Sequence, residues 1–183
     1  KNYSEIFLME KISKPLAAEL SPLQGKDYLS CADFTFNQTI SILELANQLK
    51  NGERRIDLGN RVLGLIFTKA STRTRVSFQV AMAKLGGQTI DLNPEVTQVG
   101  RGEPLKDTAR VLSSYCDALA IRTFKQEELI GYADWASIPV INALTDLEHP
   151  CQALADFLTM QQFLGSLRGQ TLTYIGDGNN VAN

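Results

Sequence analysis

VLGLIFTKASTRTR, residues 62–75, joins an apolar run to a polar turn that carries Lys69, Arg73 and Arg75. The apolar part, 62–67, is typical of a buried β-strand, and Val76 and Val80 after the turn recur at helical spacing with Ala83. The stretch therefore predicts a strand, a turn and a helix, with Ser71 or Thr72 as the N-cap residue.

The positive charge lies where a helix disfavours it, because a helix N-terminus already carries partial positive charge. Arg73 and Arg75 fall in the first helical turns, and no Asp or Glu occurs between Asp57 and Asp91. Free backbone N–H groups, hydroxyls and guanidinium groups together suit a phosphate. The alternative is structural, with hydroxyls that cap the helix and arginines that form surface ion pairs. The turn has neither a Walker-type G-x-x-x-x-G-K-[ST] pattern nor the glycines of a dinucleotide fingerprint.

Strands and helices are expected to alternate along the chain. Apolar residues recur at helical spacing from Phe36 to Leu49, and this predicted helix ends at Asn51-Gly52. Further along the chain, apolar runs predict strands, and the periodic segments between them predict helices. The predicted strands are 61–67, 88–92, 117–124, 138–144 and 171–176, and the predicted helices are 72–85, 104–115, 126–136 and 150–164. Strands that are nearly all apolar rather than alternating indicate an α/β fold in which helices flank a buried parallel sheet. Ligands should bind beyond the C-terminal ends of the strands.

Two further groups of residues fall at predicted strand ends. Arg122 closes the apolar run Ala118–Ile121, so it needs either a carboxylate partner or a bound anion. His149-Pro150-Cys151-Gln152 opens a helix, with Pro150 at the first helical position and His149 at the cap. Gln152 lies three residues on, so both side chains can face one ligand. His149 is the only histidine, and it is either structural or a neutral ring that donates N–H to a carbonyl oxygen.

The loop 93–103 is polar, contains two glycines and is long for a connection between a strand and a helix. Such loops are often lids or contact a partner, although a solvated connection has the same composition. Cys31, Cys116 and Cys151 show neither a disulfide pattern nor zinc-ligand spacing, and Cys151 has no second histidine to serve as its base.

Composition excludes several classes of function. The chain has 183 residues, 44% of them hydrophobic, and a net charge of −2, so no global basic field indicates nucleic acid. No segment approaches the length of a membrane-spanning helix, and a cytoplasmic location is expected. Residues 1–164 are expected to form one domain. Residues 165–183 are expected to be a linker and the first strand of a second, truncated α/β domain.

Four motifs resemble the aspartate/ornithine carbamoyltransferase family, and its ornithine-specific branch in particular. They occur in family order across residues 25–183, and the first and third are highly specific as a pair. The Asp-Gly-Asn-Asn end and Thr97-Gln98-Val99-Gly100 distinguish the ornithine branch. The four are FTKASTRTR (67–75), DTARVL (107–112), HPCQALAD (149–156) and GDGNN (176–180).

The resemblance implies a role for each matching residue. The phosphate of carbamoyl phosphate would be bound by Ser71, Thr72, Arg73 and Thr74. Arg122 would contact both the phosphate and the carbonyl oxygen. His149 would hydrogen-bond the same carbonyl oxygen, and Gln152 would hold the carbamoyl amine. Gln98 would reach the site of a neighbouring subunit in a homotrimer, and Asn180 would contact ornithine.

The implied reaction is transfer of the carbamoyl group to the δ-amine of ornithine, giving citrulline and phosphate in arginine biosynthesis. Arg73, Arg122 and His149 would be the catalytic residues. Neither a metal nor an organic cofactor is needed, because arginines and backbone dipoles carry the charge of the leaving group.

The family's second domain, which supplies most of the amino-acid site, is not matched here. The 183 residues are therefore expected to bind carbamoyl phosphate but to turn over ornithine poorly or not at all. Alternatives are a carbamoyltransferase for putrescine or acetylornithine, a non-catalytic binding or trimer-forming fragment, and an RNA-binding patch at 61–84. The acidic net charge and the lack of interleaved aromatic residues argue against RNA.

Overall fold

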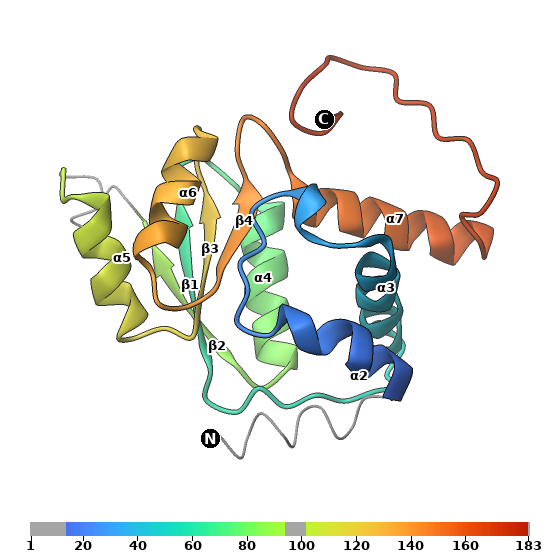
Figure 1. The fold of residues 1–183 in the computed structure, drawn as a ribbon, viewed down its shortest axis with the longest axis horizontal. Coiled ribbons are helices and arrows are strands. Elements are labelled where there is room, and N and C mark those ends of the chain that lie inside the picture. The colour runs from blue at the N-terminus through green and yellow to red at the C-terminus, as the bar shows by residue number, and fades with distance from the viewer. Residues whose placement is uncertain (1–13, 94–101, 183) are drawn as a thin grey trace.

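The computed structural model describes residues 14–93 and 102–182. These residues form a single sheet with helices on both faces (Figure 1). The strands are β1 Val62–Phe67, β2 Gln88–Leu92, β3 Ala118–Arg122 and β4 Val140–Leu144. The helices are α2 Lys14–Leu20, α3 Phe36–Lys50, α4 Arg73–Lys84, α5 Leu105–Ser113, α6 Gln126–Trp135 and α7 Pro150–Leu164, with short 3-10 turns at Ser21–Leu23 and Cys31–Asp33.

The sheet has the strand order β2-β1-β3-β4, and every pair of neighbours is parallel. Phe67 at the end of β1 lies opposite Arg122 at the end of β3, and Arg122 lies opposite Leu144 at the end of β4. The C-terminal ends of these three strands therefore meet at one edge. The predicted α/β class and four of the predicted strands are confirmed.

The core is divided by the sheet into two clusters. On one face, Ile66, Leu119 and Ile121 pack with residues of α5 and α6, including Ala109 and Leu129. On the other face, α4 covers β1 and β3: its Phe78 and Met82 pack against Leu65, Phe67 and Ala120. β1, β3 and β4 are buried on both faces, which explains why their sequences are mainly apolar rather than alternating, whereas β2 lies at the edge of the sheet and is largely exposed.

The helices begin and end close to the predicted positions. Thr35 caps α3 in a reciprocal capping box with Gln38, and Gly52 past its end has a φ of 75°. In α4, Val76 and Val80 share one face as the spacing predicts, but both are exposed, and Phe78 and Met82 make the contact with the sheet. No helix in the described part of the chain is long and apolar enough to cross a membrane.

The predicted strand at 171–176 is wrong for this structure. Gly165, with a φ of 76°, ends α7, and the following residues form an exposed, unpaired segment that curves back above α7 toward the loop after β4 (Figure 1). Ile175 is 92% exposed. A strand requires a neighbour for its backbone groups, and residues 171–176 pair with no strand among those that the structure describes.

Candidate active site

A cavity of about 240 Å³ opens at the sheet edge where β1 and β3 end. Its lining brings together the turn after β1 and the last residue of β3, as the parallel topology requires. A volume below the roughly 300–1,000 Å³ of drug-sized pockets suits a small ligand. The lining residues are Ala70, Ser71, Thr72, Arg73, Thr74 and Arg122.

The turn is fastened to β3 by Thr68. Its backbone N–H donates to the carbonyl oxygen of Arg122 at 2.9 Å, and its hydroxyl lies 3.3 Å from that of Thr123. Thr72 occupies the predicted N-cap position of α4, but its side chain makes no capping hydrogen bond. The first backbone N–H groups of α4 therefore lack a side-chain cap, as an anion-binding helix start requires.

The two arginines of the turn have different surroundings. Arg75 donates to Asp91 at 2.9 Å and lies 5.2 Å from the centre of the Phe67 ring, so it ties α4 to β2 and β1. Arg73 lines the cavity and, within the described ranges, pairs with no carboxylate. The structural interpretation of the turn thus applies to Arg75, whereas Arg73 has its guanidinium available to a ligand.

Arg122 turns toward the same cavity. One of its terminal nitrogens donates to the carbonyl oxygen of Ala70 at 3.3 Å, and its Nε is buried without a hydrogen-bond partner. Burial, and then the nearby charge of Arg73, lower the pKa of Arg122. No carboxylate among the described residues pairs with it. Two guanidinium groups that repel each other at a cavity are both stabilised by a bound anion.

His149 occupies the N-cap of α7 and Pro150 the first helical position, as predicted. Burial, and then the charge of Arg122, lower the pKa of His149, while Asp156 acts in the opposite direction. The ring is therefore neutral at pH 7. Its Nδ1 is buried and has no hydrogen-bond partner among the described residues, which favours the tautomer that carries the proton on Nε2.

Gln152 lies one turn further along α7 and donates from its amide nitrogen to Asp156 at 2.8 Å. Asp156 is not among the predicted site residues. Its signal in the sequence is its spacing, because residues four apart on a helix are neighbours. The prediction rests on the three-residue spacing of His149 and Gln152 and stops one turn short of Asp156.

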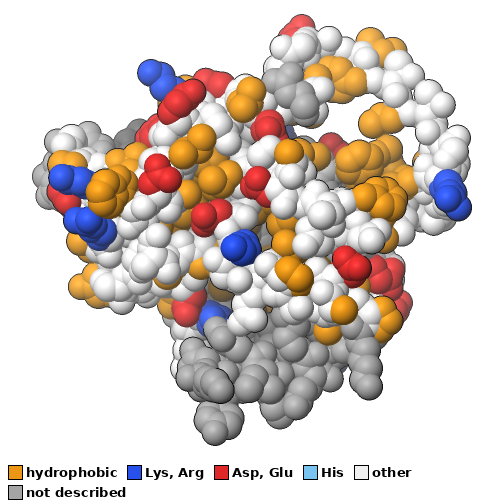
Figure 2. Space-filling view, viewed as in Figure 1, with side chains coloured by type: hydrophobic (Ala, Val, Ile, Leu, Met, Phe, Trp, Pro, Cys, Tyr) orange, Lys and Arg blue, Asp and Glu red, His pale blue; other side chains and the backbone are white. Residues whose placement is uncertain are grey.

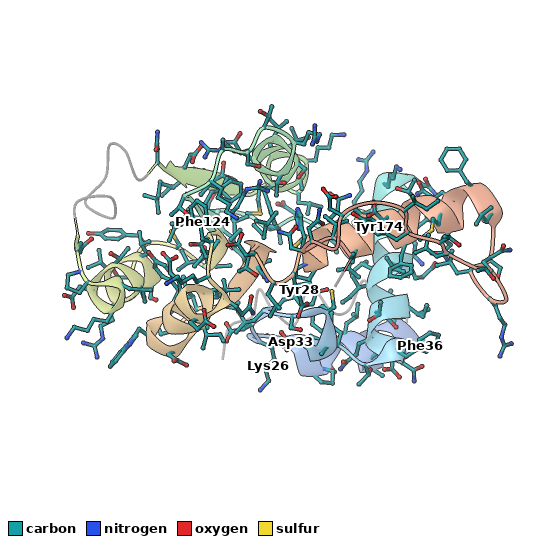
Figure 3. All side chains as sticks on the ribbon, turned by 90° about the horizontal axis from the view of Figure 1, so that it is seen from above. Lys26, Tyr28, Asp33, Phe36, Phe124 and Tyr174 are labelled. Atoms are coloured by element: carbon teal, nitrogen blue, oxygen red, sulfur yellow. The ribbon has the colours of Figure 1, made fainter. Side chains whose placement is uncertain are left out.

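Lys69 and Asp146 form an ion pair that the sequence analysis also missed. Lys69 follows β1 and Asp146 follows β4, and the Lys69 ammonium lies 4.3 Å from the centre of the ring of Phe124. Phe124, which is labelled in Figure 3, follows β3. The backbone N–H of Asp146 also donates to the carbonyl oxygen of Phe124 at 2.8 Å. These contacts join the turn after β1 to the loop that carries His149.

Two predicted residues have different outcomes in the structure. The side-chain amide of Asn180 donates to the carbonyl oxygen of Thr145 at 2.5 Å, which brings the C-terminal segment to the loop that precedes His149. Gln98 lies outside the described residues. The loop between β4 and α7 is held in place by the carboxylate of Glu148, which accepts from the hydroxyl of Ser30 at 2.8 Å and from the backbone N–H of Cys31 at 2.7 Å.

The described thiols are protonated at pH 7. Burial raises the pKa of Cys151 to about 12 and that of Cys31 to about 11, and the Cys151 thiol donates to the carbonyl oxygen of Asn142. A protonated thiol is a poor nucleophile. The described parts of the chain contain no cluster of three or more His, Cys, Asp or Glu side chains that could hold a metal ion.

Comparison with known proteins adds independent evidence. Residues 26–162 match the family model for the aspartate/ornithine carbamoyltransferase, carbamoyl-P binding domain. The ornithine carbamoyltransferase of Prochlorococcus marinus (strain MIT 9313) is 76% identical over 167 residues, which are 91% of this chain and 52% of that protein.

Solved structures agree with this match. The ornithine carbamoyltransferase of Gloeobacter violaceus superimposes with a TM-score of 0.79 at 59% identity, covering 85% of this chain and 51% of that one. The enzyme of that name from Pyrococcus furiosus superimposes with a TM-score of 0.81 at 46% identity, covering 87% and 52%. The chain thus spans about half the length of the curated relatives that it matches.

Proposed function

Because this chain belongs to the aspartate/ornithine carbamoyltransferase family, we propose that it is the carbamoyl-phosphate-binding part of an ornithine carbamoyltransferase. The observation that carries the proposal is the convergence of Arg73 and Arg122 on one cavity without a carboxylate partner in the described chain. The branch-specific motifs and the names of the relatives favour ornithine as the acceptor.

The ligand is oriented by the two sides of the site. The phosphate is held by the turn of Ser71, Thr72, Arg73 and Thr74, where guanidinium and backbone N–H donors meet. The carbonyl oxygen is directed toward Arg122 and His149, and the carbamoyl nitrogen toward Gln152. Burial, and then the charge of Arg122, lower the pKa of His149, so the two donors act on each other electrostatically.

The reaction is an acyl transfer. The neutral δ-amine of ornithine forms a bond to the carbonyl carbon, and the oxygen gains negative charge. Arg122 and His149 stabilise that charge, a contribution of roughly 3–4 kcal/mol per donor in other enzymes. The bond from carbon to the bridging oxygen then breaks, and phosphate leaves with the electron pair into the cationic turn and takes up the proton that the amine loses.

The acceptor and the assembly extend beyond the described residues. Asn180, held beside the site by Thr145, is the ornithine contact in this proposal. We further propose a cytoplasmic homotrimer acting in arginine biosynthesis, in which Gln98 reaches a neighbouring site. The exposed apolar face of α4, with Val76 and Val80, supports this assembly because a neighbouring subunit would bury it.

Other functions are less well supported. An assay of the full-length protein with each amine distinguishes ornithine from putrescine or acetylornithine as the acceptor. A non-catalytic fragment would bind carbamoyl phosphate without supporting transfer of the carbamoyl group. RNA binding requires a concentrated basic surface. Figure 2 shows Lys and Arg interspersed with Asp and Glu on the face in view.

Calorimetry with carbamoyl phosphate tests the proposal. Arg73→Ala should weaken binding by about 10- to 100-fold, because charge-assisted hydrogen bonds contribute about 1.5–3 kcal/mol. Arg75→Ala is the matched control: it removes an equal charge from the same turn but should leave affinity within about threefold, because Arg75 is engaged by Asp91. Undiminished affinity in Arg73→Ala, or equal losses in both variants, would refute the assignment.

A further inference from the structure

The proposed role of Gln152 requires one particular end of its side-chain amide, the oxygen or the nitrogen, to face the ligand. A carbamoyl group presents an NH₂ that only donates hydrogen bonds, so Gln152 must offer its carbonyl oxygen to it. A glutamine free to rotate about its last torsion presents its nitrogen or its oxygen to the ligand. Its nitrogen would face the carbamoyl nitrogen with no acceptor between them. Some other group must therefore select the orientation.

Asp156 is placed to make that selection. Its carboxylate only accepts hydrogen bonds, so the group facing it must be the amide nitrogen of Gln152, and the two lie 2.8 Å apart. The amide oxygen is then turned away from Asp156. The opposite orientation would place that oxygen against a carboxylate oxygen, which is repulsive. The contact therefore has a preferred direction as well as a position.

We propose that Asp156 is a positioning residue that holds the amide of Gln152 with its carbonyl oxygen available to the carbamoyl nitrogen. This inference rests on the proposed function, in which Gln152 contacts that nitrogen. Asp156 does not touch the reacting atoms in this account. Both side chains are exposed, so the pair adds little to stability. The effect of Asp156 should therefore appear in ligand binding.

Asp156 also acts on His149 through its charge, because it raises the pKa that burial, Arg122 and the start of α7 lower. Two variants separate charge from hydrogen bonding. Asp156→Ala removes both, whereas Asp156→Asn removes the charge but keeps a carbonyl oxygen that accepts from Gln152. Both variants should lower the pKa of His149, which NMR titration of the single histidine measures directly.

The test compares the affinities of the 183-residue chain for carbamoyl phosphate and for inorganic phosphate, which has no carbamoyl group. Asp156→Ala should weaken carbamoyl phosphate binding about three- to tenfold, as the loss of one hydrogen bond implies, and leave phosphate binding unchanged. Asp156→Asn should also weaken carbamoyl phosphate binding, because its amide can accept from Gln152 in one orientation but can donate to Gln152 in the other, so the orientation is no longer selected. In a Gln152→Ala background, Asp156→Ala should have no further effect on either ligand.

Two results would overturn the inference: equal affinities for carbamoyl phosphate in wild type and Asp156→Ala, or additive losses when Asp156→Ala is combined with Gln152→Ala. A failure of the proposed function has a different signature, because the wild-type chain would then bind carbamoyl phosphate no better than inorganic phosphate.

Discussion

The contact between Lys69 and Asp146 joins the two halves of the candidate site, and its removal should loosen both the fold and the site. Lys69 lies two residues before Ser71, and Asp146 lies three residues before His149. The relevant substitutions are Lys69→Met, which keeps most of the apolar stem, Asp146→Asn, and the two combined. Phe124→Leu removes only the aromatic face beneath the ammonium.

The expected magnitude follows from the exposure of the two side chains. The side chain of Lys69 is 20% exposed and the side chain of Asp146 is 62% exposed. The ion pair should therefore contribute about 0.2–1 kcal/mol to the free energy of unfolding, as measured for surface pairs. The contact of the ammonium with the ring of Phe124 contributes about 0.5–1 kcal/mol more. Lys69→Met should therefore cost about 1–2 kcal/mol, Asp146→Asn less than about 1 kcal/mol, and Phe124→Leu an amount between these.

Urea unfolding followed by circular dichroism provides the measurement. The double-mutant cycle should give a coupling energy of about 0.5 kcal/mol between Lys69 and Asp146, and this coupling should shrink in about 1 M salt, where the screening length falls to about 3 Å. Thermal midpoints should fall by about 2–4 °C per kcal/mol for a chain of this size. A coupling energy of zero, or one that salt leaves unchanged, would refute the reasoning.

Two further predictions concern His149 and the glycines of the core. The pKa of His149 should lie below 6.5 and should rise when inorganic phosphate binds beside Arg122. Because the folded-state pKa is lowered, the contribution of His149 to the free energy of unfolding should be constant above about pH 6.5 and should fall as the pH drops from there toward the folded-state pKa. An NMR pKa at or above 6.5 without ligand would contradict this. Gly64→Ala should cost about 1–3 kcal/mol in urea unfolding, because the new Cβ would lie 2.8 Å from Leu119 Cδ2 and 3.2 Å from Cys116 Sγ. Gly131→Ala in α6 is the control, because its new Cβ would have its nearest neighbour, Leu105 Cδ1, at 3.4 Å. This substitution should raise the free energy of unfolding by about 0.5–1 kcal/mol. Equal effects of the two substitutions would show that the packing argument is wrong.

Local pattern was sufficient for much of the fold and for part of the site. The run 62–67, the polar turn and the spacing of α4 predicted one βα unit correctly, and Pro150 fixed the start of α7 and so the position of His149. A parallel sheet then places Arg73 and Arg122 at the same edge without further information. These predictions depend on short-range chemistry and on one topological rule.

The remaining features depend on contacts between distant segments. The role of Arg75 is set by Asp91 on β2, which the sequence of the turn does not specify, and Lys69 meets Asp146 only because β1, β3 and β4 end side by side. The apolar residues 171–176 predicted a strand, but a strand forms only beside a partner. Asn180 nevertheless contacts the loop before His149, through one hydrogen bond to the carbonyl oxygen of Thr145.

The central claim is that this cavity binds carbamoyl phosphate in one orientation. A crystal structure of the chain with carbamoyl phosphate bound tests it most directly. Phosphate oxygens should lie within hydrogen-bond distance of Arg73, Arg122 and the backbone N–H groups of the turn, and the carbonyl oxygen should face His149. A ligand bound elsewhere, or one with its carbonyl oxygen turned away from His149, would contradict it.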